Sequence, residues 1–230
     1  MWSRLMFLWL LLCFLTPLPP TPAEEPSPGA ELARRVQLRY QKVLALSARY
    51  QRTSRYLATG GKGPRQVQAA GRLLWRRPLS LRLEQDQPRP ELVVTTAQGV
   101  WWVRPHRRRA DLYPLEQFTA GLRSLLDVLG GLARVEESFR LRQPTPQERE
   151  LAGDDLVLVL QPRRRRADLK RLVVWFQPQS LLLSGFRIVN LLGDQTDYRL
   201  SGLEVNPHLP PGTFSYQPPA DYRIRDHRLR

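Results

Sequence analysis

The amino-acid sequence predicts a mainly β protein with some α-helix: an antiparallel sheet of about ten or eleven strands that curls into a barrel or half-barrel. Three observations lead to this class. Apolar and polar residues alternate through most of the chain, which is typical of strands with one buried face. Turn signals separate these runs by short connections, which favours antiparallel pairing. The period lengthens to that of a helix in two places only.

The first helix is expected over residues 30–46 and the second over residues 115–130, where the glycines at 130 and 131 end it. Apolar positions recur at helical spacing in both segments, so each helix carries one apolar stripe. Because these stripes have few other apolar surfaces to contact, we expect the two helices to cover or plug the mouth of the curled sheet.

Strands account for most of the remaining chain, and residues 144–152 are predicted to form a loop. A hairpin turn is expected at residues 97–99 and a loop at residues 60–64. The expected strands lie at residues 47–57, 66–76, 79–84, 91–96, 100–103, 107–113, 155–161, 168–176, 181–191, 196–205 and 213–216, and residues 134–142 are a candidate for one more.

Composition narrows the class of protein. The chain has 230 residues, with 36 Lys+Arg against 21 Asp+Glu, a formal charge of +15. Hydrophobic residues make up 42%, enough for a packed core. The single cysteine, Cys13, excludes a disulfide scaffold, a zinc ribbon and a cysteine nucleophile. Such a charge would ordinarily favour nucleic acid or an anionic membrane as partner.

The N-terminus indicates export. Arg4 precedes an apolar run over residues 5–15 that is too short to span a bilayer, and Thr21-Pro22-Ala23 fits the cleavage pattern of a signal peptide. We therefore expect a signal peptide over 1–23, a flexible leader over 24–29, one domain over 30–225 and a basic tail over 226–230. An exported protein rarely meets nucleic acid, so no nucleic-acid partner is expected.

Two other interpretations of the N-terminus stay open. One is an uncleaved membrane anchor. The other is lipoprotein processing at Cys13, which Leu12 disfavours because a small residue should precede the cysteine.

One face of the predicted sheet is strongly apolar. Such a face forms either the core of a filled barrel or the wall of a cavity for an apolar ligand, and the pattern alone does not separate the two. The candidate cavity residues are Leu73, Trp75, Leu79, Leu81, Leu83, Leu92, Val94, Val100, Trp102, Leu172, Val174, Phe176, Phe186 and Ile188.

Catalytic and metal-binding patterns are not found in the sequence. His106, His208 and His227 have no partner at ligand spacing, so no metal is expected. Asp154 and Asp155 are adjacent, and adjacent strand residues point to opposite faces. The sequence also has no nucleophile elbow, phosphate-binding loop or dinucleotide fingerprint. We therefore predict neither an enzyme nor a cofactor, and expect a monomer.

Two arginine runs, at residues 107–109 and 163–166, lie at strand ends or turns. They are either solvated turn residues or a surface that attracts anionic lipid headgroups, at about 1 kcal/mol per basic residue near such a surface.

Several motifs, in order, resemble the LolA-type outer-membrane lipoprotein carriers of Gram-negative bacteria. GRLLWRRP resembles the family's G-x-x-W-x-R-P strand end, QGVWWVRP its tryptophan hairpin, and GTFSYQPP its closing F-x-F-x-P-P. The matching segments are residues 71–78, 98–105, 154–155, 168–176 and 212–219. Val103, the short loop at 60–64 and the basic surface depart from the family pattern.

The resemblance implies an unclosed barrel whose helices act as a lid over a cavity for the acyl chains of a lipoprotein. An inner-membrane ABC transporter would release this cargo, and an outer-membrane receptor would receive it after transit through the periplasm. By the same likeness Arg77 holds the empty carrier closed. The lid would then comprise Arg77, Phe118, Leu122, Leu125 and Leu126.

A second function is compatible with the same scaffold, namely a lipid-sensing periplasmic domain that binds acyl chains but regulates a membrane partner. A third, an exported enzyme, would need a polar constellation that the sequence does not offer.

Overall fold

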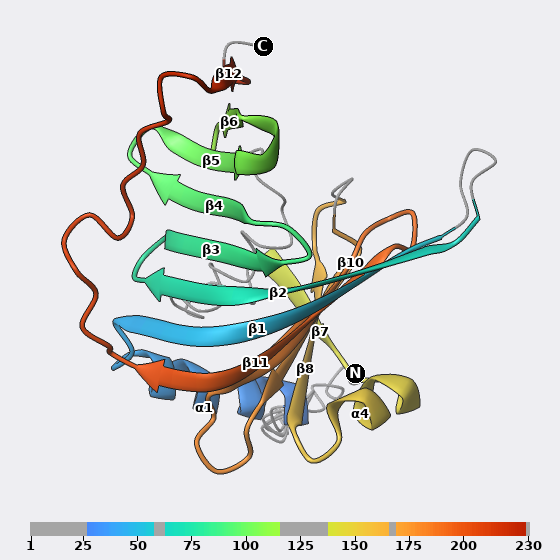
Figure 1. Ribbon diagram of the computed structural model, residues 1–230. Coiled ribbons are helices and arrows are strands. Elements are labelled where there is room, and N and C mark those ends of the chain that lie inside the picture. Colours follow the sequence, from blue (N-terminus) through green and yellow to red (C-terminus); the bar gives the residue numbers. More distant parts are fainter. Residues whose placement is uncertain (1–26, 58–62, 116–137, 166–168, 229–230) are drawn as a thin grey trace, which may run out of the picture.

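The computed structural model of the chain describes residues 27–57, 63–115, 138–165 and 169–228 (Figure 1). These ranges form one strongly curved sheet of twelve strands with α-helix on either side of it. In chain order the elements are α1 (Pro28–Tyr40), β1 (Ala45–Tyr56), β2 (Arg65–Arg76), β3 (Ser80–Gln87), β4 (Glu91–Thr96), β5 (Gly99–Arg104), the 3₁₀ turn η1 (Pro105–Arg107), β6 (Arg109–Tyr113), β7 (Phe139–Arg142), α4 (Pro146–Ala152), β8 (Leu156–Pro162), β9 (Arg171–Phe176), β10 (Leu183–Val189), β11 (Gln195–Val205) and β12 (Arg223–Asp226).

The sheet is an unclosed half-barrel, as the sequence predicts. Its strand order is β12-β6-β5-β4-β3-β2-β1-β11-β10-β9-β8-β7, so β12 and β7 are two separate edges. Strand β1 pairs with both β2 and β11 and thereby joins the two halves of the chain. The pairs are antiparallel except that of β12 with β6, which is parallel.

Helix α1 ends earlier than the predicted range of 30–46. Ser27 caps its N-terminus by accepting a hydrogen bond from the Ala30 amide at 3.3 Å. The helix stops at Tyr40 because the chain pairs with β2 from Ala45 onward, and the Asn206 side chain accepts hydrogen bonds from the amides of Leu44 and Ala45. Tertiary pairing therefore outweighs the helical pattern of the last residues.

Residues predicted as a loop at 144–152 instead contain helix α4. Thr145 and Glu148 form a capping box, in which each side chain accepts a hydrogen bond from the other residue's amide, and Pro146 occupies the first turn. This Thr-Pro-x-Glu pattern was the sequence signal for the helix. Helix α4 lies against β8 and covers an outer cluster formed by Ala152, Val159, Val173 and Trp175.

The last predicted strand, at residues 213–216, is also wrong. The backbone forms turns at these residues, because the Thr213 amide donates to the Pro210 carbonyl and the Ser215 amide to the Gly212 carbonyl. The strand forms further on, as β12, which includes the first residue of the predicted basic tail. The second predicted helix, 115–130, lies outside the described residues apart from Leu115.

The two faces of the sheet have separate cores. We call the face that α1 covers the inner face and the opposite one the outer face. The inner cluster is large and includes Leu32, Val36 and Tyr40 of α1. On the outer face, a second cluster at β4–β6 lies under Tyr216 and Tyr222 of residues 207–228, which we call the C-terminal segment. This segment runs from the end of β11 to β12 along one side of the sheet (Figure 1).

Candidate functional site

The inner face brings together most of the residues predicted to line a cavity. Of these, Leu79 and Ile188 are partly buried against the inner cluster. The others that belong to the cluster are buried: Leu73, Trp75, Leu81, Leu83, Leu172, Val174, Phe176 and Phe186. Strands from both halves of the chain contribute, so the face is one continuous apolar surface, with tyrosines Tyr50 and Tyr198 near its middle.

Leu92 and Val94 do not share this face. In the β4–β5 hairpin, Leu92 pairs with Val103 and Val94 with Trp101, and these residues belong to the outer cluster. The prediction that placed them beside Val100 and Trp102 is wrong, because the register pairs even-numbered residues of β4 with odd-numbered residues of β5.

Val100 and Trp102 have the register of the inner face. Trp102 pairs with Val93, which packs against the inner cluster, and the Trp102 indole donates to a Glu91 carboxylate oxygen at 3.0 Å. The adjacent residues Trp101 and Trp102 therefore lie on opposite faces of the sheet, Trp101 on the outer and Trp102 on the inner face.

Helix α1 closes part of the inner face, and Arg77 ties it there. The Arg77 guanidinium donates to the carbonyl oxygen of Tyr40 at 2.5 Å and to that of Val43 at 3.3 Å. The Arg77 main-chain amide also donates a hydrogen bond to the carbonyl oxygen of Leu44 at 2.8 Å. These carbonyls belong to the last turn of the helix and the linker after it, where carbonyls lack helical partners and arginine offers several fixed donors.

The other half of the sheet holds the same end of α1. The buried Tyr40 hydroxyl accepts a hydrogen bond from the Leu183 amide at 2.9 Å, and its ring meets Phe176 edge-on at 6.4 Å. Burial raises the pKa of Tyr40 well above its ordinary value, so the phenol stays neutral. Arg39 adds a bond to the Ser180 carbonyl at 3.1 Å. The end of α1 therefore bridges β2 and the β9–β10 turn.

The beginning of α1 borders open space. A groove of about 580 Å³ lies between the first turns of α1, the connection from β7 to α4, and the start of β8. Its lining combines apolar Leu32 and Leu156 with charged Arg35, Arg142 and Asp155. The remaining proposed lid residues, Phe118, Leu122, Leu125 and Leu126, lie outside the described residues.

A charged cluster that the sequence did not predict lies at the β6 edge. Asp111 is fully buried, and its carboxylate accepts hydrogen bonds from Arg104 and from Arg109, the latter at 2.5 and 2.7 Å. A further hydrogen bond joins this carboxylate to the His227 ring at 2.9 Å. Burial acts to raise the pKa of Asp111, but the hydrogen bonds from Arg109, His227 and Arg104 lower it to about 2.

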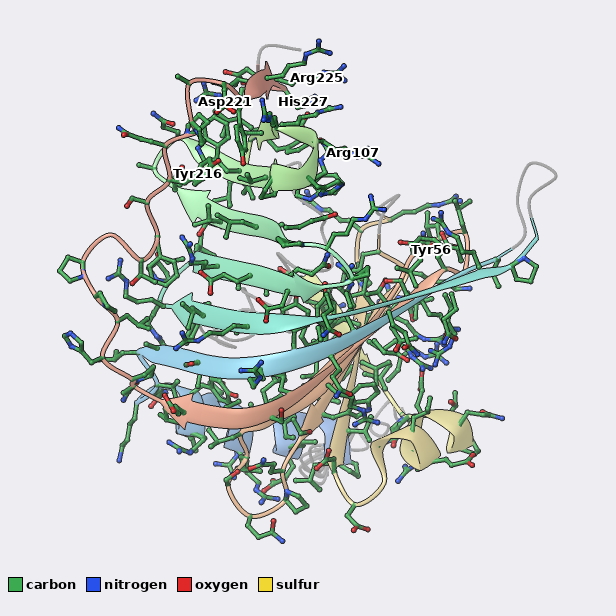
Figure 2. All side chains as sticks on the ribbon, in the orientation of Figure 1. Tyr56, Arg107, Tyr216, Asp221, Arg225 and His227 are labelled. Carbon is green, nitrogen blue, oxygen red and sulfur yellow. The ribbon has the colours of Figure 1, made fainter. Side chains whose placement is uncertain are left out.

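His227 is held on two sides, because its ring also stacks on Tyr113 at 4.3 Å. Figure 2 shows His227 with Arg225, Asp221 and Tyr216 gathered around β5, β6 and β12. This cluster joins the end of the C-terminal segment to the sheet edge at β6.

The arginine run at 107–109 divides between two roles. Arg107 and Arg108 are exposed at the turn, whereas Arg109 pairs with Asp111. The Asp155 carboxylate accepts a hydrogen bond from the Ser184 hydroxyl at 2.6 Å.

Over the ranges described, His, Cys, Asp and Glu form no group of three or more that could hold a metal ion. In the same ranges no helix is long and apolar enough to cross a bilayer.

The chain thus has an open, curved sheet with an apolar inner face and a helix tied over part of that face. Residues 41–217 match the family model described as outer membrane lipoprotein carrier protein LolA. The chain therefore belongs to the LolA family, which is a family of carriers.

Its relatives carry the same description. The outer-membrane lipoprotein carrier protein of Alkalilimnicola ehrlichii is 27% identical over 223 residues, covering 91% of this chain and 89% of that protein. That of Pseudomonas paraeruginosa is 24% identical over 178 residues, covering 77% and 79%. The solved structure of a LolA superfamily protein from Nitrosomonas europaea covers 80% of this chain and 97% of its own, at 10% identity and a TM-score of 0.41.

Proposed function

We propose that this protein is a periplasmic carrier that holds the acyl chains of lipoproteins against its inner face and transfers them from the inner to the outer membrane. The observation that carries this proposal is the latch: Arg77 binds main-chain oxygens at the end of α1, a helix whose apolar side chains cover part of the apolar inner face. The carrier description of its relatives supports the same function.

A latched cover is what reversible binding of a lipid requires. Burying an acyl chain of about 16 carbons contributes on the order of 10 kcal/mol, at about 0.8 kcal/mol per methylene. A ligand bound that tightly would dissociate slowly. If helix α1 competes with the chain for the inner face, closing the helix lowers the net affinity and helps to release the cargo.

The route includes partners on both sides. An inner-membrane ABC transporter supplies the lipoprotein and an outer-membrane receptor accepts it. The carrier works as a monomer, after a signal peptide is removed near Ala23 and leaves one binding domain over residues 30–225. Mass spectrometry of the protein isolated from periplasm tests this assignment: bound lipoprotein supports it, and free phospholipid or an empty protein contradicts it.

The latch is tested by the substitution Arg77→Leu. It removes the hydrogen bonds to Tyr40 and Val43, each contributing about 1 kcal/mol, so the closed state weakens and loaded carrier retains its cargo. We expect the transfer rate to an outer-membrane receptor to fall about tenfold.

Arg76→Leu is the matched control. Arg76 neighbours Arg77 but is exposed, with its guanidinium 4.8 Å from the Phe214 ring centroid, so transfer should be unchanged. Equal transfer by wild type and a folded Arg77→Leu variant would reject the latch.

A further inference from the structure

Exposed apolar side chains gather at one end of the sheet. Four of the eight large apolar side chains that are exposed among the described residues lie there, namely Tyr56, Leu57, Leu191 and Leu192. We call this group the apolar end. It is far from the latch, because β1 begins at Ala45 beside Arg76 and runs twelve residues to Tyr56. Single exposed apolar residues are ordinary, whereas a group of them marks a contact surface.

The apolar end is formed by two turns that are joined to each other. The Leu57 amide, just after β1, donates to the Asp194 carboxylate at 2.9 Å, and a Cβ on Gly193 would come within 2.8 Å of the Leu57 side chain. The Asn190 side chain closes the β10–β11 turn, since it donates to the Asp194 carboxylate at 3.0 Å and accepts from the Asp194 amide at 2.9 Å. This turn is therefore fixed, and it holds Leu192 at 68% exposure.

Basic side chains border the apolar end on two sides. On the side of β2, the Arg65 guanidinium lies 4.6 Å from the centroid of the Tyr56 ring. On the side of β9, Lys170 is exposed, and its amide donates to the Val189 carbonyl at 2.7 Å. This bond places the β8–β9 connection beside the β10–β11 turn.

Both arginine runs of the sequence lie at this end of the sheet. Of the run at 163–166, Arg164 and Arg165 are exposed in the β8–β9 connection. Arg107 and Arg108 are exposed between β5 and β6. Because successive antiparallel strands reverse direction, the β1–β2, β3–β4 and β5–β6 turns share one end, and Figure 2 shows Arg107 and Tyr56 on the same side of the molecule.

The carboxylates described in the β1–β2, β8–β9 and β10–β11 turns and the strand ends beside them leave an excess of positive charge. Asp194 is occupied by the hydrogen bonds within the apolar end. Asp197 accepts hydrogen bonds from Arg55 at 2.7 Å and from Arg187 at 2.5 and 2.7 Å, so its single negative charge meets two arginines. Exposed leucines bordered by basic side chains are typical of surfaces that attach to anionic bilayers.

We propose that the apolar end docks the protein on an anionic phospholipid surface, with Leu57 and Leu192 entering the lipid interface and the bordering basic residues binding headgroup phosphates. Tyr56 suits this boundary, because its ring is apolar and its hydroxyl is polar. A second copy of the chain fits less well, since two positively charged ends would repel each other. The surface is separate from the inner face, so the inference does not depend on the proposed carrier function.

Cosedimentation with lipid vesicles tests the proposal. The mature protein, without its signal peptide, is mixed with vesicles of phosphatidylcholine alone or of equal parts phosphatidylcholine and phosphatidylglycerol. Wild type should bind only the anionic vesicles, and less in high salt, because salt screens the attraction. The double substitution Arg164→Ser, Arg165→Ser should lower the partition coefficient about thirtyfold. Leu192→Ser should lower it about tenfold, because less apolar surface leaves water.

Two control variants remove the same groups elsewhere. Arg49→Ser with Arg72→Ser removes two exposed arginines that pair across β1 and β2 on the outer face, and Leu38→Ser replaces a leucine of α1 that is 50% exposed. Both should bind anionic vesicles as wild type does. An equal loss in the two double variants would show that net charge acts and not this end of the sheet. Leu192→Ser that binds like wild type would equally overturn the proposal.

The remaining outcomes separate the possible occupants. Equal binding of wild type to both kinds of vesicle overturns selection for anionic lipid. Binding to neither overturns lipid docking altogether and leaves an acidic protein surface as the occupant. Lipoprotein binding at the inner face should be the same in all of these variants. Its absence in wild type would contradict the carrier function and leave the vesicle result as it stands.

Discussion

Two segments cover the two faces of one sheet, and they are attached in different ways. Helix α1 lies on the inner face, where Arg77 and Tyr40 join its last turn and the linker after it to the sheet by hydrogen bonds. The C-terminal segment lies on the outer face of β4–β6, adds strand β12 to the edge, and places His227 against the buried Asp111. One cover adds no strand to the sheet, whereas the other becomes part of it.

The difference leads to an expectation of which cover would move in the proposed carrier. Opening α1 would break a few hydrogen bonds to main-chain groups and expose the apolar residues Leu32, Val36 and Tyr40, whose contacts an acyl chain on the inner face could replace. Removing the C-terminal segment would expose a row of main-chain groups on β6 and leave a buried carboxylate with one partner fewer. Under the proposed function, α1 would therefore be the cover that opens, and the C-terminal segment would keep the sheet edge in place. Three substitutions test this division, and the largest effect is expected at the outer cluster.

Trp101→Ala should release the C-terminal segment. The Trp101 ring is 4% exposed and contacts Tyr216, with ring centroids 5.7 Å apart. Removing it leaves a cavity in the outer cluster, and we expect a loss of about 4 kcal/mol in the free energy of unfolding. Chemical denaturation measures the loss, and trypsin should cleave earlier at Arg223 and Arg225.

Trp102→Ala is the matched control, since this neighbouring indole lies on the inner face, is only partly buried and bonds Glu91. It should leave cleavage of the C-terminal segment at its wild-type rate. Unchanged cleavage in Trp101→Ala would mean that β12 and Asp111 alone hold the segment.

Asp111→Asn should destabilise the protein at neutral pH and change its response to acid. The folded-state pKa of about 2 lies below the ordinary value of 3.8, so the ionised carboxylate stabilises the fold above about pH 4. This contribution disappears as the pH falls toward 2. Breaking the buried network should cost about 3 kcal/mol at pH 7, and the difference from wild type should shrink between pH 4 and pH 2.

Asp226→Asn provides the comparison for this experiment. The pKa of Asp226 is also lowered to about 2, chiefly by hydrogen bonds from Arg228, but the pair is exposed to solvent. Water screens such a pair, so its loss should not change unfolding measurably. A pH-independent difference between Asp111→Asn and wild type would show that the carboxylate charge does not stabilise the edge.

The sequence predicts the regular parts of this fold well, because their signals are local. Strict alternation at Leu79, Leu81 and Leu83 indicates a strand with one buried face, and the strand is found. The short helix α4 was missed although its capping box is local, because seven residues offer too little periodicity to detect. The prediction that Leu92 and Val94 lie on the inner face was wrong, because the face depends on the register of the hairpin, and the register depends on where the hairpin loop begins and ends.

The site is less accessible to sequence reasoning than the fold. Asp111 and His227 lie 116 residues apart, and neither has a local motif that indicates the other. The latch role of Arg77 follows from the family resemblance and stays a proposal, whereas its hydrogen bonds to the end of α1 are visible only in the structure.

Asn206 joins the two covers, and its substitution should have the smallest effect. It ends β11, where the C-terminal segment begins, and its side-chain oxygen accepts from the amides of Leu44 and Ala45 at 2.7 and 3.1 Å. Its side-chain nitrogen donates to the Lys42 carbonyl at 3.1 Å. Because these groups are largely exposed, Asn206→Ala should cost about 1–2 kcal/mol and speed hydrogen exchange at Leu44 and Ala45.

Two further variants separate the side-chain bonds from the backbone at this position. Asn206 has a φ of 54°, which glycine tolerates and alanine does not. Asn206→Gly therefore isolates the lost hydrogen bonds, and Asn206→Asp keeps the acceptor but not the donor. If the Asn206 acceptor links the covers, Asp retains slow exchange at Leu44 and Ala45 while Gly loses it. Equal exchange in Asp and Gly would mean that the linker between α1 and β1 is held by strand pairing alone.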